Sequence, residues 1–182
     1  GCIYVSASLE HPGVLVQHGP ILRVVFGPRD PSYISPILSA IQSDLCESGI
    51  DGVLSTHIQR DALEKFSYVS PIGAAGVYLH AVAGDFQKEG PARELFKSMI
   101  REISALAAAM GYPFEKDYVK INLEILSNLS ADATTSMQRD IMEGKPSELD
   151  GLVMEPLRLA KKYSVSMPCY EEVANVLCPL EF

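Results

Sequence analysis

The pattern of hydrophobic and polar positions changes its period near residue 58. Before that point, the apolar residues form short runs rich in β-branched and aromatic side chains, and such runs predict strands. Turn-forming sequences, His11-Pro12-Gly13 and His18-Gly19-Pro20, separate these runs, so we expect an antiparallel meander rather than crossover connections. The expected strands cover residues 3–7, 14–17 and 22–26.

A single helix is expected within this β-rich region. Pro36 suits the first helical position and Ser35 suits the N-cap, and the apolar residues that follow recur at helical spacing. Gly49 is typical of a helix end. A last short strand is expected at residues 53–55, so that residues 1–57 together form one β-rich region.

Helical spacing dominates from residue 58 onward and predicts an all-helical domain over residues 58–182. Pro156 should bend or break the fifth of its helices, because proline supplies no backbone N–H. The expected helices lie at about 58–82, from 91 to about 110, around 119–126, and at about 134–143, 147–163 and 169–179.

The charge balance disfavours a partner made of nucleic acid. The 182 residues include 15 basic and 23 acidic side chains, which gives a net charge of −8 without a basic stripe. No apolar run approaches the ~20 residues needed to cross a bilayer, and no secretory leader precedes the first strand. We therefore expect a cytoplasmic protein that binds neither nucleic acid nor a membrane.

The four cysteines are widely spaced, at positions 2, 46, 169 and 178. They form no C-x-x-C pair, and no histidine stands beside any of them. This spacing favours buried free thiols over a disulfide framework or a zinc site. We expect no bound metal.

A motif with many specified positions at fixed spacing begins at Ser136. The run Ser136-Met137-Gln138-Arg139-Asp140, then Gly144-Lys145, then Ser147-Glu148-Leu149-Asp150, resembles the closing motif of the ketopantoate (2-dehydropantoate) reductases. An apolar helix and Val165-Ser166-Met167-Pro168 follow it, as in that family. Gly13-Val14 and Gly19 resemble another family pattern, so the resemblance covers nearly the whole chain.

The resemblance implies both a fold and an activity. Residues 1–57 would be the antiparallel, β-rich tail of a truncated Rossmann domain, and residues 58–182 would be the helical C-terminal domain of the type shared with 6-phosphogluconate dehydrogenases. The implied reaction is the NADPH-dependent reduction of ketopantoate to pantoate, in pantothenate and coenzyme A biosynthesis. The chain carries no G-x-G-x-x-G turn for the pyrophosphate. We therefore expect NADP to bind mainly outside this chain, which alone should be inactive.

Lys65 is the candidate general acid of this reaction. The stretch Asp61-Ala62-Leu63-Glu64-Lys65-Phe66 is similar to the surroundings of the family's catalytic lysine. A lysine can give its proton to a nascent alkoxide if burial lowers its pKa toward neutrality. The alternative is an ordinary solvated lysine that pairs with Asp61 one helical turn away.

The positions that follow Lys65 depart from the family pattern. Typical members carry asparagines at the fourth and eighth positions after the lysine, where Val69 and Gly73 stand here. Pro71 removes a further backbone donor and leaves the carbonyl of Ser67 without its helical partner. Ser67 and Ser70 are more plausible as structural residues than as replacements for the lost amides. The departures weaken the case for ketopantoate itself as the substrate, but they do not weaken the family resemblance.

Ser136 and Glu148 are the candidate substrate-binding residues, because they match the family's serine and glutamate in identity and spacing. Each also has a structural alternative. Thr135 and Gln138 could form a capping box, which would place Ser136 in a solvated first turn. Glu148 could lie in a first helical turn and interact with the helix dipole. We interpret Asp150 as a cap, and Asn122 and Asn128 as residues of helix surfaces.

Three functions are consistent with the sequence. The first is the C-terminal part of a ketopantoate reductase. The second is a reductase of another small branched 2-keto acid, and the third is a non-catalytic helical module for oligomerisation or binding. We also expect a homodimer or a larger assembly, because the β-rich region leaves an unpaired edge and an apolar face exposed.

Overall fold

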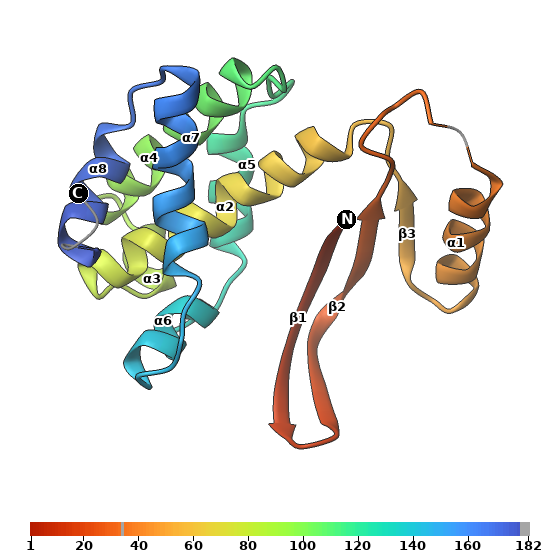
Figure 1. Ribbon diagram of the computed structural model, residues 1–182. Helices are drawn as coiled ribbons and strands as arrows, with labels where there is room; N and C mark the ends of the chain where they lie inside the picture. Colours follow the sequence, from red (N-terminus) through yellow and green to blue (C-terminus); the bar gives the residue numbers. More distant parts are fainter. Residues whose placement is uncertain (34, 179–182) are drawn as a thin grey trace. The chain divides into compact units, whose positions relative to one another are not determined.

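The computed structural model describes residues 1–33 and 35–178. By its internal contacts the chain divides into two compact units, Gly1–Ala62 and Leu63–Phe182. The first holds a three-stranded sheet and one complete helix, and the second is helical (Figure 1). The predicted fold class, a mostly helical chain that follows a small β-rich region, is confirmed.

The first unit is built on one long hairpin. Strand β1 (Cys2–His11) pairs antiparallel with β2 (Val14–Phe26), and Gly13 takes a φ of 87° in the turn between them. The turn predicted at residues 18–20 is wrong, because β2 runs through it. The pairing passes from Ala7 with Gln17 to Val5 with Leu22, so the extra residues of β2 are accommodated as an irregularity of the ladder.

The third strand shows that the sheet is not wholly antiparallel. Strand β3 (Asp51–Leu54) pairs parallel with β2, and α1 (Pro36–Glu47) lies between the two strands in the sequence. A parallel pair needs a crossover connection, which here contains this helix. A Cβ at Gly52 would lie 2.9 Å from Cβ of Leu45, so only glycine allows this close approach of α1 to β3.

The predicted start and end of α1 are confirmed only in part. Ser35 occupies the N-cap, but its side chain makes no capping hydrogen bond. Gly49, with a φ of 79°, follows the helix end as expected.

The core of this first unit is small. Its buried side chains are Cys2, Val25 and Ile58, with Tyr4 and Val53 packed against them. Many other apolar side chains of the hairpin are exposed, including Ile3, Leu9, Leu15 and Ile21, the last three each more than 60% accessible. The hairpin therefore presents apolar surface along much of its length.

The second unit contains a short helix, α3, between the helices expected at 58–82 and from 91, where the sequence predicted none. Helix α2 ends at Leu79, His80 takes a positive φ of 51°, and α3 follows. The predicted helix at 147–163 divides into a π-helical turn, η1, and α7. Residue 179, the expected end of the last helix, lies outside the described residues. The elements are α2 (Ile58–Leu79), α3 (Ala83–Gln87), α4 (Pro91–Ala109), α5 (Tyr118–Ser127), α6 (Ser136–Met142), η1 (Asp150–Met154), α7 (Glu155–Tyr163) and α8 (Pro168–Leu177).

Pro156 explains the break between η1 and α7. It lies in the first turn of α7, where its missing N–H costs little. The expectation that the helix changes at this proline is confirmed.

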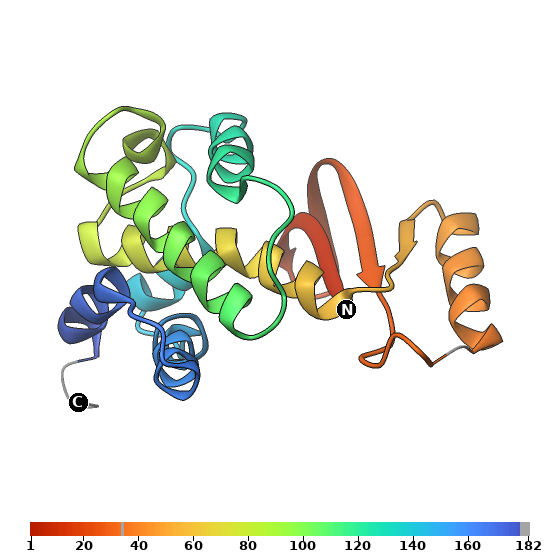
Figure 2. The same cartoon turned by 90° about the horizontal axis from the view of Figure 1, so that it is seen from above.

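Helix α4 forms the centre of the core in the second unit. It contacts α3, α5, α7 and α8, and it lies among the other helices of this unit in both views (Figures 1 and 2). Phe96 of α4 meets the rings of Phe86 and Tyr68 edge to face, at centroid distances of 5.9 and 6.0 Å. The buried side chains on its inner face are Phe96, Met99, Ile100, Ile103, Leu106 and Ala107.

Candidate active site

The middle of α2 is held by a buried amide. Pro71 cannot donate a hydrogen bond to the carbonyl of Ser67, and Nδ2 of Asn122 on α5 donates to that carbonyl at 3.0 Å. The same nitrogen contacts Oγ of Ser67 at 3.1 Å. Asn122 is 1% exposed, so its assignment to a helix surface was wrong. The asparagine satisfies a group that the proline leaves unpaired.

Ser70 connects the same helix to the C-terminal part of the unit. Its hydroxyl donates to the carbonyl of Leu152 in η1 at 2.6 Å and lies 2.5 Å from the hydroxyl of Tyr170 in α8. Both Ser67 and Ser70 are fully buried and hydrogen-bonded. Their predicted structural role is confirmed.

Two glycines bring α6 close to α2. A Cβ at Gly76 would lie 2.7 to 2.9 Å from three side-chain atoms of Gln138, which real side chains do not allow. A Cβ at Gly73 would lie 3.1 Å from Cε of Met137, the flexible end of a side chain. Thr135 and Leu152 are the other close neighbours of Gly73. The start of α6 and η1 therefore meet α2 at Gly73.

Lys65 lies on the face of α2 that includes these glycines. Positions 65, 69, 73 and 76 are separated by four, four and three residues, a spacing that places them along one side of a helix. Lys65 and Val69 are half-buried. The carboxylate of Asp61, its suggested partner, accepts a hydrogen bond from Oγ of Ser55.

Ser136 begins α6 behind a capping box. Thr135 accepts a hydrogen bond from the backbone N–H of Gln138 at 3.2 Å, and Oε1 of Gln138 accepts from the N–H of Thr135 at 3.0 Å. This box was predicted from the sequence and is confirmed. Ser136 is exposed in the first turn, next to the two residues that contact Gly73.

Glu148 lies in the segment that leads into η1. Its side chain is exposed, and its carbonyl accepts a hydrogen bond from the N–H of Leu152 at 2.9 Å. Asp150 does not act as a cap as expected, because its carboxylate pairs with Arg158. The hydrogen bond from that guanidinium lowers the pKa of Asp150. Lys65, Ser136 and Glu148 thus lie on or beside the three elements that meet at Gly73.

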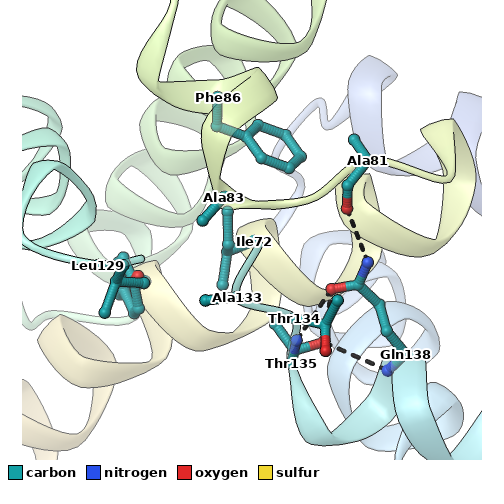
Figure 3. Close-up of a pocket in the computed structure, with 10 residues that line it drawn as sticks. Ile72, Ala81, Ala83, Phe86, Leu129, Ala133, Thr134, Thr135 and Gln138 are labelled. Carbon is teal, nitrogen blue, oxygen red and sulfur yellow. Dashed lines mark hydrogen bonds between the residues drawn. The ribbon is translucent and has the colours of Figure 1, made fainter. Parts of the chain in front are cut away.

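An apolar pocket of about 160 Å³ lies beside this meeting point (Figure 3). Helices α2 and α3 and the segment from Leu129 to Gln138 line it. Figure 3 shows Ile72, Ala83 and Phe86 near the pocket, and Gln138 hydrogen-bonded to Ala81 and Thr135. The sequence did not reveal this pocket, because its lining comes from segments that are distant along the chain.

Tyr68 lines this pocket and carries a buried hydroxyl. Among the described residues, its hydroxyl is the buried side-chain oxygen or nitrogen that has no hydrogen-bond partner. Burial raises the pKa of Tyr68 to about 12. The hydroxyl is therefore neutral and able to donate throughout the physiological range. The sequence shows three hydroxyl residues close together, Ser67, Tyr68 and Ser70. It does not show which of their hydroxyl groups lacks a hydrogen-bond partner.

The raised pKa of Tyr68 predicts a loss of stability in alkali. The ordinary pKa is 10.0 and the folded value is about 12, so the folded state keeps a proton that the unfolded state loses between these values. Stability is complete below pH 10 and falls as the pH rises toward 12, by up to about 1.4 kcal/mol per pH unit for each such group. Burial raises the pKa of Tyr170 as well, which adds to the same loss. Urea unfolding of the parent and of Tyr68→Phe across this range should show a shallower decline for the variant. Equal slopes would contradict the buried state of Tyr68.

The four cysteines are thiols rather than disulfides, as expected, but they are not all buried. Cys2 is buried, Cys46 is exposed, and the other two are intermediate. Burial, with a contribution from Glu102, raises the pKa of Cys169 to about 11, which disfavours the reactive thiolate. Within residues 1–33 and 35–178, no group of three potential metal ligands is brought together.

The described residues do not form a dinucleotide cradle. Gly73 and Gly76, which frame the run Gly-Ala-Ala-Gly, lie inside α2 and face α6, where no phosphate could approach their backbone. Over the part of the chain that the structure describes, no helix is both long enough and apolar enough to span a bilayer.

Comparison with known proteins places the chain in a family. Residues 57–181 match the family model described as the C-terminal domain of ketopantoate reductases, PanE/ApbA. The chain therefore belongs to the ketopantoate reductase C-terminal family. A curated relative is an uncharacterized oxidoreductase, YkpB, of Bacillus subtilis (strain 168), with 21% identity over 95% of this chain and 57% of the relative.

Solved structures share the fold at low identity. A 2-dehydropantoate 2-reductase from Methylococcus capsulatus has 22% identity and a TM-score of 0.84 over 98% of this chain and 61% of that one. A D-mandelate dehydrogenase in complex with NADH and anilino(oxo)acetate has 18% identity and a TM-score of 0.85, over 97% of this chain and 57% of that one. The chain thus spans about 60% of the length of these relatives.

Proposed function

We propose that this chain is the helical part of an oxidoreductase that reduces a small 2-keto acid with NADPH. The observation that carries the proposal is the convergence at Gly73 of the three elements that bear Lys65, Ser136 and Glu148. Residues 58–182 would be the substrate and dimerisation domain. Residues 1–57 would be the tail of the dinucleotide-binding domain, whose remainder would hold NADP.

The residues of this chain would bind the substrate and supply a proton. When bound by the rest of the protein, NADPH would supply the hydride that reduces the carbonyl carbon, which would leave NADP and a negatively charged carbonyl oxygen. Lys65 would give a proton from its ammonium group to that oxygen, which yields the 2-hydroxy acid. Ser136 and Glu148 would orient the substrate through hydrogen bonds.

The identity of the 2-keto acid has two candidates. Reduction of ketopantoate to pantoate, in pantothenate and coenzyme A biosynthesis, is the first, supported by the family and by the 2-dehydropantoate 2-reductase of similar fold. A different branched 2-keto acid is supported by Val69 and Gly73, which cannot supply the amide groups of the family pattern. A similar fold is also found in a protein named as a D-mandelate dehydrogenase.

A non-catalytic role for the helical domain is the alternative from another class. A non-catalytic domain would not need Lys65 and Glu148, the two residues that match the family's catalytic lysine and substrate-binding glutamate. A homodimer is part of the proposal: the helical domain would form one contact, and the exposed apolar side chains of the hairpin would offer a second.

Turnover by a full-length protein tests the proposal. Oxidation of NADPH should be followed with ketopantoate and with a panel of 2-keto acids that differ in side chain. The proposal expects at least one substrate to be reduced to its 2-hydroxy acid, and expects the 182-residue chain alone to bind no NADPH in calorimetric titration. Absence of turnover on the whole panel would favour the non-catalytic alternative.

A further inference from the structure

We propose that the pocket beside Tyr68 receives the side chain of the substrate, and that this side chain is an aromatic ring with a hydrogen-bond acceptor that faces the Tyr68 hydroxyl. The inference rests on the proposed function, because it supplies the substrate class of the same site. It separates this chain from reductases of small aliphatic 2-keto acids.

The size of the pocket fits one ring. Its volume is about 160 Å³, and apolar cavities of about 150 Å³ bind a benzene-sized molecule. Ile72, Ala83, Phe86 and Ala133 supply apolar lining, and Ala83 and Phe86 are nearly fully buried. A ring is flat and large for its number of rotatable bonds, so its burial costs little conformational entropy.

Among the polar side chains that line the pocket, one has a hydrogen-bonding group that a ligand could pair with. Thr135 and Gln138 are engaged in the capping box, and Nε2 of Gln138 donates to the carbonyl of Ala81 at 2.8 Å. Oγ1 of Thr134 is contacted by the guanidinium of Arg139. The Tyr68 hydroxyl has no partner among the described residues. A buried unpaired hydroxyl is unfavourable, so a ligand oxygen at this point would gain a hydrogen bond that the protein already leaves unmade.

The pocket lies next to the residues that would bind the substrate, where it could receive the side chain of the 2-keto acid. Ile72 and Thr135, which line it, directly precede Gly73 and Ser136 in the chain. A substrate held by Ser136 could therefore extend its side chain toward Tyr68.

Binding of simple rings to the 182-residue chain tests the pocket without turnover. Phenol and toluene serve as probes, and their dissociation constants are measured by ligand-observed NMR for the parent and for three variants. Ala83→Leu adds bulk inside the pocket and should weaken both probes at least tenfold. Ala105→Leu makes the same change on the exposed face of α4 and should leave both unchanged. Tyr68→Phe should weaken phenol about fivefold, the effect of one hydrogen bond, and leave toluene as in the parent.

The outcomes separate the pocket from the proposed reaction. Failure of the parent to bind either ring at millimolar concentration, or equal binding by the parent and Ala83→Leu, would overturn the inference. If Ala83→Leu does not fold, the Tyr68→Phe variant provides the test. Dissociation constants that change equally for phenol and for toluene in this variant would count against the inference.

Turnover of a full-length protein provides the second arm. The ratio of kcat/KM for 4-hydroxyphenylglyoxylate to that for 2-oxobutanoate should exceed one in the parent and fall at least tenfold in Ala83→Leu. An unchanged ratio would refute the subsite and leave the reductase intact. Ring binding with the predicted variant pattern, but with no 2-keto acid reduced, would refute the reductase and leave only a ring-binding pocket.

Discussion

Replacement of Lys65 by alanine in a full-length protein is expected to lower kcat by ~10²–10⁴, the usual contribution of a positioned general acid. The affinity for NADPH should change little, because the described residues form no dinucleotide cradle. Steady-state kinetics with the best 2-keto acid of the panel measures the first quantity, and fluorescence titration with NADPH measures the second. Lys65 is half-buried on α2 rather than part of the apolar core, so thermal stability should be nearly unchanged.

Two other variants sharpen this test. Lys120→Ala removes an exposed lysine from α5 and should leave kcat as in the parent. Glu148→Ala should mainly raise KM, because Glu148 would bind substrate rather than donate the proton. A Lys65→Ala protein that retains at least a third of the parent kcat would refute the proposed acid.

The second large effect concerns stability and the pair formed by Asn122 and Pro71. Asn122→Ala removes the side-chain donor to the Ser67 carbonyl and should lower the free energy of unfolding by roughly 1–3 kcal/mol, the cost of a buried unsatisfied group. Pro71→Ala supplies a backbone N–H one helical turn after Ser67. In the Pro71→Ala background the same Asn122→Ala change should therefore cost clearly less. Urea unfolding of the four proteins gives both costs.

Asn128 provides the matched control for this cycle. Its side chain is exposed at the end of α5 and donates only within that helix, to the carbonyl of Glu124 at 2.8 Å. Asn128→Ala should cost much less than Asn122→Ala and should be insensitive to Pro71→Ala. If the two asparagine changes cost the same, or if the cost at Asn122 does not depend on Pro71, the carbonyl of Ser67 is not the group that Asn122 protects.

These residues show where sequence reasoning succeeds and where it stops. The capping box of Thr135 and Gln138 joins residues three apart, so its chemistry is visible in the sequence. Pro71 also predicted an unpaired carbonyl at Ser67. The residue that pairs with this carbonyl is 55 positions away, and nothing local distinguishes buried Asn122 from exposed Asn128.

The same limit explains the error in the sheet. His18-Gly19-Pro20 has the composition of a turn, but the pairing of β2 with β1 on both sides of it keeps the strand continuous. Long-range pairing therefore overrides a local turn signal. The family motif was informative because its residues build α6, η1 and their connection, whereas the pocket depends on contacts between segments that no motif links.

The π-helical turn at Asp150–Met154 has a consequence for the direction of Glu148. A π-helical turn is equivalent to one surplus residue in an α-helix, and each residue corresponds to a rotation of about 100° around the helix axis. Leu149, which directly precedes the turn, is therefore rotated by that angle relative to the phase of α7. Glu148 lies in the bend before it and outside the helix, whereas Ala160, which packs into the core, follows the turn. The packing of α7 therefore does not fix the direction of the Glu148 side chain, which depends on the segment that connects α6 to η1.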